Sequence, residues 1–171
     1  VLRAVAERVL GAPSLERGVW EVETVYYHAR VAVEVGGGCS HAEGIVAVAD
    51  ATDAASVAAA ASALAAATTA EVKVLADVSG GEALTDDDAL IDALADARAE
   101  LVGVDVADAV RDAGLVNPDG EPWGTRRVRV ALEAHTWPGL VLRQPAGPPA
   151  PEQPEPPHGL TRGDHDLPDD D

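Results

Sequence analysis

The chain has 171 residues, of which 47% are hydrophobic and only 3% aromatic, and its formal net charge is −18. This length suffices for one domain whose core is built from Val, Leu, Ile and Ala. The negative charge argues against nucleic acid or anionic membrane as a partner, although it also suits the solvated surface of a halophile's protein. One cysteine permits no internal disulfide and no apolar run is long enough to span a bilayer, so we expect a soluble, cytoplasmic protein.

The first part of the chain predicts a helix and then a pair of strands. Apolar residues at helical spacing begin directly after Val1, and Gly11–Ser14 ends this helix. Because a strand before the helix would complete a βα unit, we expect that residues upstream of Val1 are missing. Segments rich in Val, Tyr and Trp predict two adjacent antiparallel strands, Val19–Thr24 and Tyr26–Val35, followed by a loop over Gly36–Gly44.

The middle of the chain alternates strands with helices. The predicted elements are a buried parallel strand (Ile45–Ala49), an alanine-rich helix (Ala54–Ala70), a strand (Glu71–Val78), a helix capped by Thr85–Asp88 that carries Leu90, Ile91, Leu94 and Leu101, a strand (Leu101–Val106), a short helical turn closed by Gly114, and a turn at Asn117–Gly120. This alternation predicts an α/β domain with a mostly parallel sheet and helices on both of its faces.

The last part of the chain contains an ambiguous segment and a tail. Arg126–Leu132 fits both the period of a strand and that of a helix. From Pro145 onward the chain is rich in proline and ends in Asp169–Asp171, which predicts a disordered acidic tail. We therefore divide the chain into an α/β domain over residues 1–144, incomplete at its N-terminus, and a tail over residues 145–171.

The sequence contains none of the usual nucleotide-binding motifs. It has no GxxxxGK[ST] phosphate loop and no Rossmann GxGxxG, and its single lysine, Lys73, lies in a predicted strand. The glycine-rich segment Gly36–Ser40 has no lysine after it and is interpreted as a flexible connection. The place where GTPases carry a base-reading Asn/Thr-Lys-x-Asp segment is Asp77–Gly81, which lacks the Asp–Lys pair. We therefore expect neither nucleotide binding nor GTP hydrolysis.

Other candidate sites are weak. Cys39 and His41 offer two metal ligands where structural zinc needs four, so we expect no metal and no cofactor. Asp86–Asp88 is interpreted as favourable charge at a helix start rather than an acid/base site. Arg126, Arg127 and Arg129 form the only basic cluster, which is either a partner-docking patch or a solvated helix face paired to nearby acids.

Two segments about a hundred residues apart carry a resemblance to a known family. Trp20 followed by Tyr26, Tyr27 and Ala29 resembles the central strand pair of the alpha- and gamma-adaptin-binding protein family. The segment from Gly124 to Trp137 is similar to the closing helix of that family's GTPase-like domain. The residues that match are Trp20, Tyr26, Tyr27, Ala29, Gly124, Arg126, Arg127, Ala131, Leu132, Ala134 and Trp137.

The resemblance implies a small-GTPase-like fold without catalysis, a pseudo-GTPase, in which Arg126–Trp137 is helical. It also implies a chaperone that binds alpha- or gamma-adaptin and small adaptor subunits before the clathrin adaptor complex is complete. Such a protein would cover apolar interface until the proper partner arrives. The family's domain begins with a strand and a loop ahead of the first helix, and the resemblance implies that these two elements precede Val1.

Two other functions stay open from the sequence. One is a small GTPase-like nucleotide hydrolase whose phosphate loop lies upstream of Val1, and the other is an uncharacterised acidic α/β domain. The scarce aromatic residues also have a structural interpretation. We expect Trp20, Tyr26, Tyr27 and Trp137 to pack in the core, where the strand pair meets the final helix.

Overall fold

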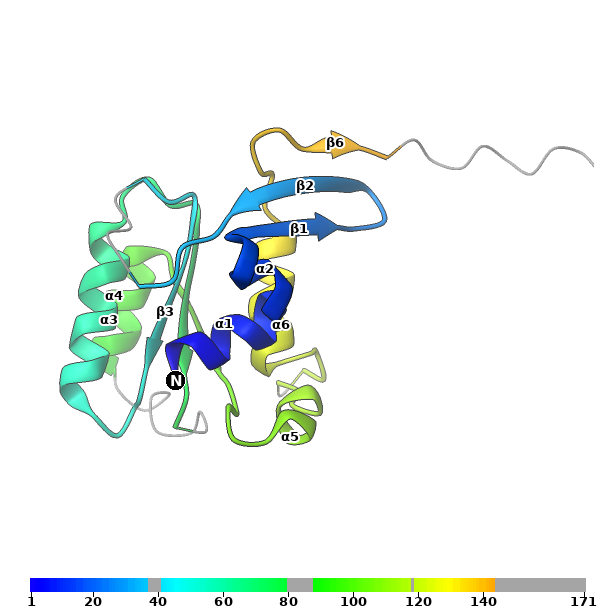
Figure 1. Ribbon diagram of the computed structural model, residues 1–171. Coiled ribbons are helices and arrows are strands. Elements are labelled where there is room, and N and C mark those ends of the chain that lie inside the picture. The colour runs from blue at the N-terminus through cyan, green and yellow to red at the C-terminus, as the bar shows by residue number, and fades with distance from the viewer. Residues whose placement is uncertain (37–40, 80–87, 118, 144–171) are drawn as a thin grey trace, which may run out of the picture.

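Figure 1 shows a computed structural model that describes residues 1–36, 41–79, 88–117 and 119–143. Two three-stranded sheets share this part of the chain, and their strand orders are β1-β2-β6 and β3-β4-β5. The elements are α1 (Leu2–Leu10), α2 (Ala12–Arg17), β1 (Val19–Glu23), β2 (Tyr27–Ala32), β3 (Gly44–Ala49), α3 (Ala54–Ala66), β4 (Val72–Asp77), α4 (Asp88–Ala97), β5 (Glu100–Gly103), α5 (Ala109–Ala113), α6 (Gly124–Glu133) and β6 (Val141–Leu142).

Sheet A, formed by β1, β2 and β6, is antiparallel. Its register runs from Val19 opposite Ala32 to Glu23 opposite His28, so the predicted antiparallel strand pair is confirmed. The second strand is shorter than the predicted Tyr26–Val35, because it ends at Ala32. Strand β6 was missed by sequence analysis; its two residues pair with the start of β2.

Sheet B, formed by β3, β4 and β5, is fully parallel, as the alternation of strands and helices predicts. Figure 1 shows α3 and α4 on one side of this sheet and α1 and α6 on the other. The prediction of one mostly parallel sheet is wrong in one respect, because the hairpin β1–β2 belongs to a separate sheet. The α/β class with helices on both faces of a parallel sheet is confirmed.

Several predicted boundaries need correction. The helix α1 ends at Leu10, but Gly11 at φ +84° starts a second short helix, α2, that sequence analysis missed. The alanine-rich helix α3 ends at Ala66 rather than Ala70. Leu101 lies in β5 and not on the preceding helix, and Ile91 is 42% exposed.

The ambiguous segment Arg126–Leu132 is helical, within α6. The helix ends at Glu133, so Trp137 follows it rather than belonging to it. Burial explains why this segment is a helix and not a strand. Val128 and Leu132 both face the core, and their spacing of four positions places them on one face of a helix. The predicted turn after α5 is also present, with the Gly120 N–H donating to the Asn117 carbonyl at 2.9 Å.

Two hydrophobic cores lie on the two faces of sheet B. The larger one joins β1, β2, β4 and β5 to α1 and α6, and the smaller one lies under α3 and α4. Cys39, the predicted cap at residues 85–87 and the predicted tail over residues 145–171 lie outside the described residues. Within the described part, no helix is long and apolar enough to cross a membrane.

Candidate functional site

The carboxyl ends of parallel strands are the usual ligand-binding edge of an open α/β sheet. In sheet B an aspartate stands at or just after each of these ends: Asp50 after β3, Asp77 at the end of β4 and Asp105 after β5. All three side chains are engaged with the backbone. Asp77 Oδ1 accepts the N–H groups of Ala51 and Ser79, each at 3.0 Å, and so joins the ends of β3 and β4.

The other two aspartates stabilise their own loops in the same way. Hydrogen bonds from the Thr52 hydroxyl and backbone N–H lower the pKa of Asp50. The backbone N–H of Asp108 and the charge of Arg111 lower the pKa of Asp105. Both groups are therefore ionised at neutral pH. Negative charge at this edge disfavours the phosphate groups that positive helix N-termini and lysines bind in nucleotide-binding folds.

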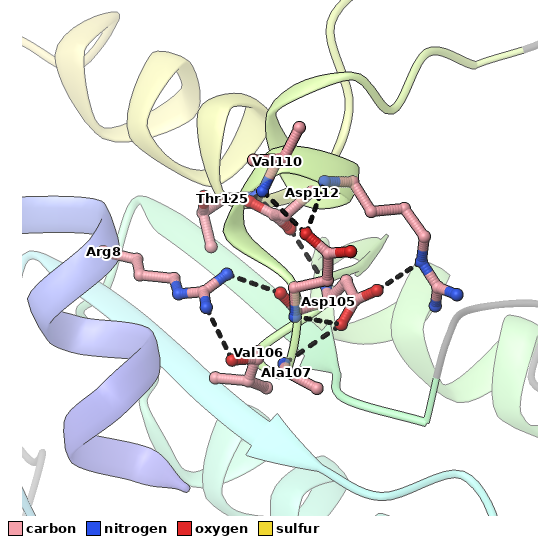
Figure 2. Close-up of polar contacts among 9 residues, drawn as sticks. Arg8, Asp105, Val106, Ala107, Val110, Asp112 and Thr125 are labelled. Atoms are coloured by element: carbon pink, nitrogen blue, oxygen red, sulfur yellow. Dashed lines mark hydrogen bonds and ion pairs between the residues drawn. The ribbon is translucent and has the colours of Figure 1, made fainter.

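Next to Asp105 lies a partly buried group of polar contacts, drawn in Figure 2, which we call the Asp112 cluster (Arg8, Asp105, Asp112 and Thr125). Asp112 is 2% exposed; its Oδ1 accepts the Asp105 N–H at 2.9 Å, and its carboxylate also accepts the Thr125 N–H and hydroxyl. It thereby caps α6, whose own N-cap residue, Trp123, makes no side-chain cap hydrogen bond. Arg8 of α1 donates to the Asp105 and Val106 carbonyls at 2.6 Å.

The Asp112 cluster explains one residue of the family resemblance. Gly124 has φ +67°, and a Cβ there would lie 2.6 Å from Asp112 Oδ1. Glycine is therefore required at the start of α6 by both its backbone conformation and the close approach of the carboxylate. Sequence analysis did not single out Asp112. Its hydrogen-bond partners, Asp105 and Thr125, lie 7 and 13 positions away in the sequence, so no local motif marks it.

The two segments of the resemblance meet in one packed group, the aromatic cluster (Trp20, Tyr27, Leu132, His135 and Trp137). The Trp20 and Trp137 rings are edge to face with centroids 6.4 Å apart, and Trp137 Nε1 donates to the Leu132 carbonyl at 2.9 Å. The Tyr27 hydroxyl donates to the carbonyls of Glu133 and His135. Burial, with a smaller contribution from the Glu133 charge, raises the Tyr27 pKa. These contacts close the end of α6 onto the hairpin.

The predicted core positions are confirmed for three of the four aromatic residues. Trp20, Tyr27 and Trp137 are 3%, 9% and 7% exposed, but Tyr26 is 76% exposed, so its predicted core packing is wrong. The alternation of β2 explains this, because Tyr27 and Ala29 face the core. Of the remaining residues of the resemblance, Ala29, Gly124 and Leu132 are buried, Arg127 and Ala131 are half-buried, and Arg126 and Ala134 are exposed.

The basic cluster is largely paired within the chain. Arg127 makes a two-pronged ion pair with Glu100 of β5, which raises the Arg127 pKa, and its Nη2 lies 2.9 Å from Glu100 Oε2. Arg129 pairs with Glu133 one turn further along α6. Among the described residues Arg126 forms no ion pair, so it is the member of the cluster whose charge is available to a partner.

A cavity of about 540 Å³ opens at the amino ends of β3 and β4. His135 lies in it with its side chain 8% exposed, Nε2 3.4 Å from Glu43 and Nδ1 3.7 Å from Glu71. The two carboxylates face different ring nitrogens, so they do not converge on one metal position. In the described part of the chain no group of three or more His, Cys, Asp or Glu side chains could hold a metal ion. Of the two side chains considered as metal ligands from the sequence, Cys39 lies outside that part and His41 lines this cavity.

The chain was compared with protein-family models, curated proteins and solved structures. No protein-family model, curated protein or solved structure matches this chain.

Proposed function

We propose that this chain is a non-catalytic, GTPase-like module that binds free subunits of clathrin adaptor complexes. Its partners are alpha- or gamma-adaptin and the small adaptor subunits, and its role is to assist adaptor assembly in vesicle transport. The aromatic cluster carries this proposal. The two sequence segments that resemble the adaptin-binding family are joined by the Tyr27–Glu133 hydrogen bond across 106 positions, so they act as one structural unit.

The carboxyl edge of sheet B is the reason for proposing a non-catalytic module. The position where a nucleotide-binding α/β protein holds phosphate is lined here by Asp50, Asp77 and Asp105, whose oxygens are already used by backbone N–H groups. This arrangement supports a binding module over a nucleotide hydrolase. A micromolar affinity for labelled GTP would refute this part of the proposal and favour the hydrolase.

Exposed apolar side chains gather at the end of sheet A that includes the hairpin turn. Val25 and Tyr26 are 78% and 76% exposed, and Val141 and Leu142 in the neighbouring strand β6 are 51% and 73% exposed. We call this group the hairpin patch. Large apolar side chains exposed together are typical of a protein-binding surface. Tyrosine is enriched in interface hot spots, which makes Tyr26 the residue to test.

The experiment is a pull-down of separately produced adaptor large and small subunits by this chain, after circular dichroism has shown that it is folded. We expect capture of free alpha- or gamma-adaptin that is lost when the other subunits of the complex are added. Tyr26→Ser should weaken capture. Val110→Ser is the matched control, because Val110 is 84% exposed and lies on α5, far from sheet A in Figure 1.

A charge reversal tests the basic cluster of α6. Arg126→Glu should weaken capture if the unpaired cation of α6 contacts the partner, and the reduction should be larger at low salt. Failure of the folded chain to capture any free adaptor subunit would refute the adaptor proposal.

A further inference from the structure

The cavity at the amino ends of β3 and β4 contains two neighbouring carboxylates. Glu43 and Glu71 directly precede the two strands and are held side by side, because the Glu71 N–H donates to the Glu43 carbonyl at 2.8 Å. Both side chains line the cavity together with His135 and Trp137. Among the described residues no lysine or arginine forms an ion pair with either carboxylate. Like charges on neighbouring strands are unfavourable, so the cavity favours a positively charged ligand.

The aromatic cluster holds the other walls of the cavity in place. The His135 ring lies edge to face against Trp137 with centroids 4.6 Å apart, and the Tyr27 hydroxyl donates to the His135 carbonyl at 3.2 Å. A Cβ on Gly44 would lie 3.0 Å from Trp137 Cη2, so the indole ring lies directly against the start of β3. These contacts form the site before any ligand arrives, which lowers the entropic cost of binding.

His135 in its neutral form cannot donate to both carboxylates. Its Nε2 lies 3.4 Å from Glu43 and its Nδ1 3.7 Å from Glu71, and a neutral imidazole has one N–H and one lone pair. Whichever nitrogen carries the proton, the other presents its lone pair to a carboxylate, and both of these atoms are acceptors. The side chain that carries this nitrogen is only 8% exposed. N–H groups of a ligand would satisfy the nitrogen and the carboxylates together.

We propose that this cavity binds the guanidinium group of an arginine side chain presented by a protein partner. A guanidinium is planar, permanently charged and carries five N–H donors and no acceptor, so it can donate to both carboxylates and to the ring nitrogen. Trp137 in the wall favours the same group, because arginine stacks on aromatic rings. A volume of about 540 Å³ admits a side chain of this size. The proposal does not depend on the partner being an adaptor subunit.

The lining of the cavity selects this ligand over others. Anions are repelled by the two carboxylates, and a lysine ammonium is a compact point charge without the planar fork that reaches several acceptors at once. Free arginine brings a carboxylate of its own, which Glu43 and Glu71 repel. Pro138 in the cavity wall is also joined by a short stretch of chain to Val141 of the hairpin patch. A protein partner seated on that patch therefore lies close to the cavity.

An NMR titration at neutral pH tests the proposal. The probe is a short glycine peptide with a single arginine, blocked at both ends. In the free chain we expect one neutral tautomer of His135. The peptide should cause saturable shifts of the His135 ring nitrogens and of the Trp137 indole N–H. The same peptide with lysine in place of arginine, and free arginine itself, should each bind at least about threefold more weakly.

Substitutions locate the binding to the two carboxylates. Glu43→Gln and Glu71→Gln keep the shape of the side chains, and each should weaken binding by about threefold and their combination by about tenfold. Asp119→Asn is the matched control and should leave binding unchanged. It also removes one exposed negative charge, but from the turn between α5 and α6, and Figure 1 shows α5 at the other end of sheet B from the start of β3.

Other outcomes would overturn the proposal. The absence of saturable shifts at His135 and Trp137 in a folded chain would do so. A doubly protonated His135 in the free chain at neutral pH would do so as well, because both carboxylates would then have their donors. Equal binding of free arginine would make this a small-molecule site. Binding seen only in the Arg162→Gln variant would make Arg162, the one arginine outside the described residues, the occupant instead of a partner.

Discussion

Removal of the Trp137 side chain tests the aromatic cluster most directly. Trp137 is 7% exposed, contacts Trp20 edge to face and donates a hydrogen bond to the Leu132 carbonyl. Truncation of a buried tryptophan to alanine costs about 3–5 kcal/mol. The free energy of unfolding of a domain is about 5–15 kcal/mol, so Trp137→Ala should remove a large part of it.

A second substitution separates packing from hydrogen bonding. Trp137→Phe keeps an aromatic ring against Trp20 but removes the Nε1 donor to the Leu132 carbonyl, which then keeps only the longer bond from the His135 N–H at 3.3 Å, and the loss should cost about 1 kcal/mol. Urea denaturation followed by circular dichroism measures both variants. With a urea slope of about 2 kcal/mol per molar, Trp137→Ala should lower the midpoint by about 2 M. Tyr26→Ala is the control, since exposed substitutions change stability by less than about 0.5 kcal/mol. An unchanged midpoint for Trp137→Ala would refute the role of the cluster.

Three more predictions concern the neighbouring contacts. Gly124→Ala should destabilise the protein by about 1–3 kcal/mol in thermal melts, because it combines a positive φ with an approach to Asp112, and a neutral result would contradict both. Asp105→Asn should lower the melting temperature at pH 7, and the difference should shrink once the pH falls below the ordinary pKa of an aspartate toward the lowered folded-state pKa of Asp105, because the ionised carboxylate contributes its stability only above that pKa. A double-mutant cycle on Arg127 and Glu100 should give a coupling of about 0.5–1 kcal/mol that shrinks with salt, whereas strict additivity would show that the pair is not formed in solution.

Local pattern was sufficient for the elements of sheet B. A continuous apolar run predicted β3, because a strand buried on both faces needs apolar residues at every position, and the bulk of Val72, Val74 and Leu75 predicted β4. The separation into two sheets could not be predicted in this way. Whether β2 pairs with β3 depends on contacts between segments that are distant in sequence, and no local residue pattern encodes it.

The errors at single residues have equally physical causes. Tyr26 was assigned to the core because aromatic residues are scarce, although the period of two in β2 places its neighbour Tyr27 inward. Asp112 escaped notice because an isolated aspartate in an acidic chain carries no signal until Gly124 and Thr125 are brought beside it. The second helix, α2, was missed because Gly11 and Pro13 read as a terminator, whereas proline is well accepted in the first turn of a new helix.

The Tyr27–Glu133 contact has a consequence for synthesis on the ribosome. Closing a loop of 106 residues costs about 4 kcal/mol of chain entropy, and it cannot occur until the end of α6 has left the exit tunnel. Until then the nascent hairpin presents Trp20 and Tyr27 without the partners that cover them. The aromatic face of the hairpin therefore stays exposed while more than a hundred further residues are translated, and exposed apolar surface of this kind is what general chaperones cover during synthesis.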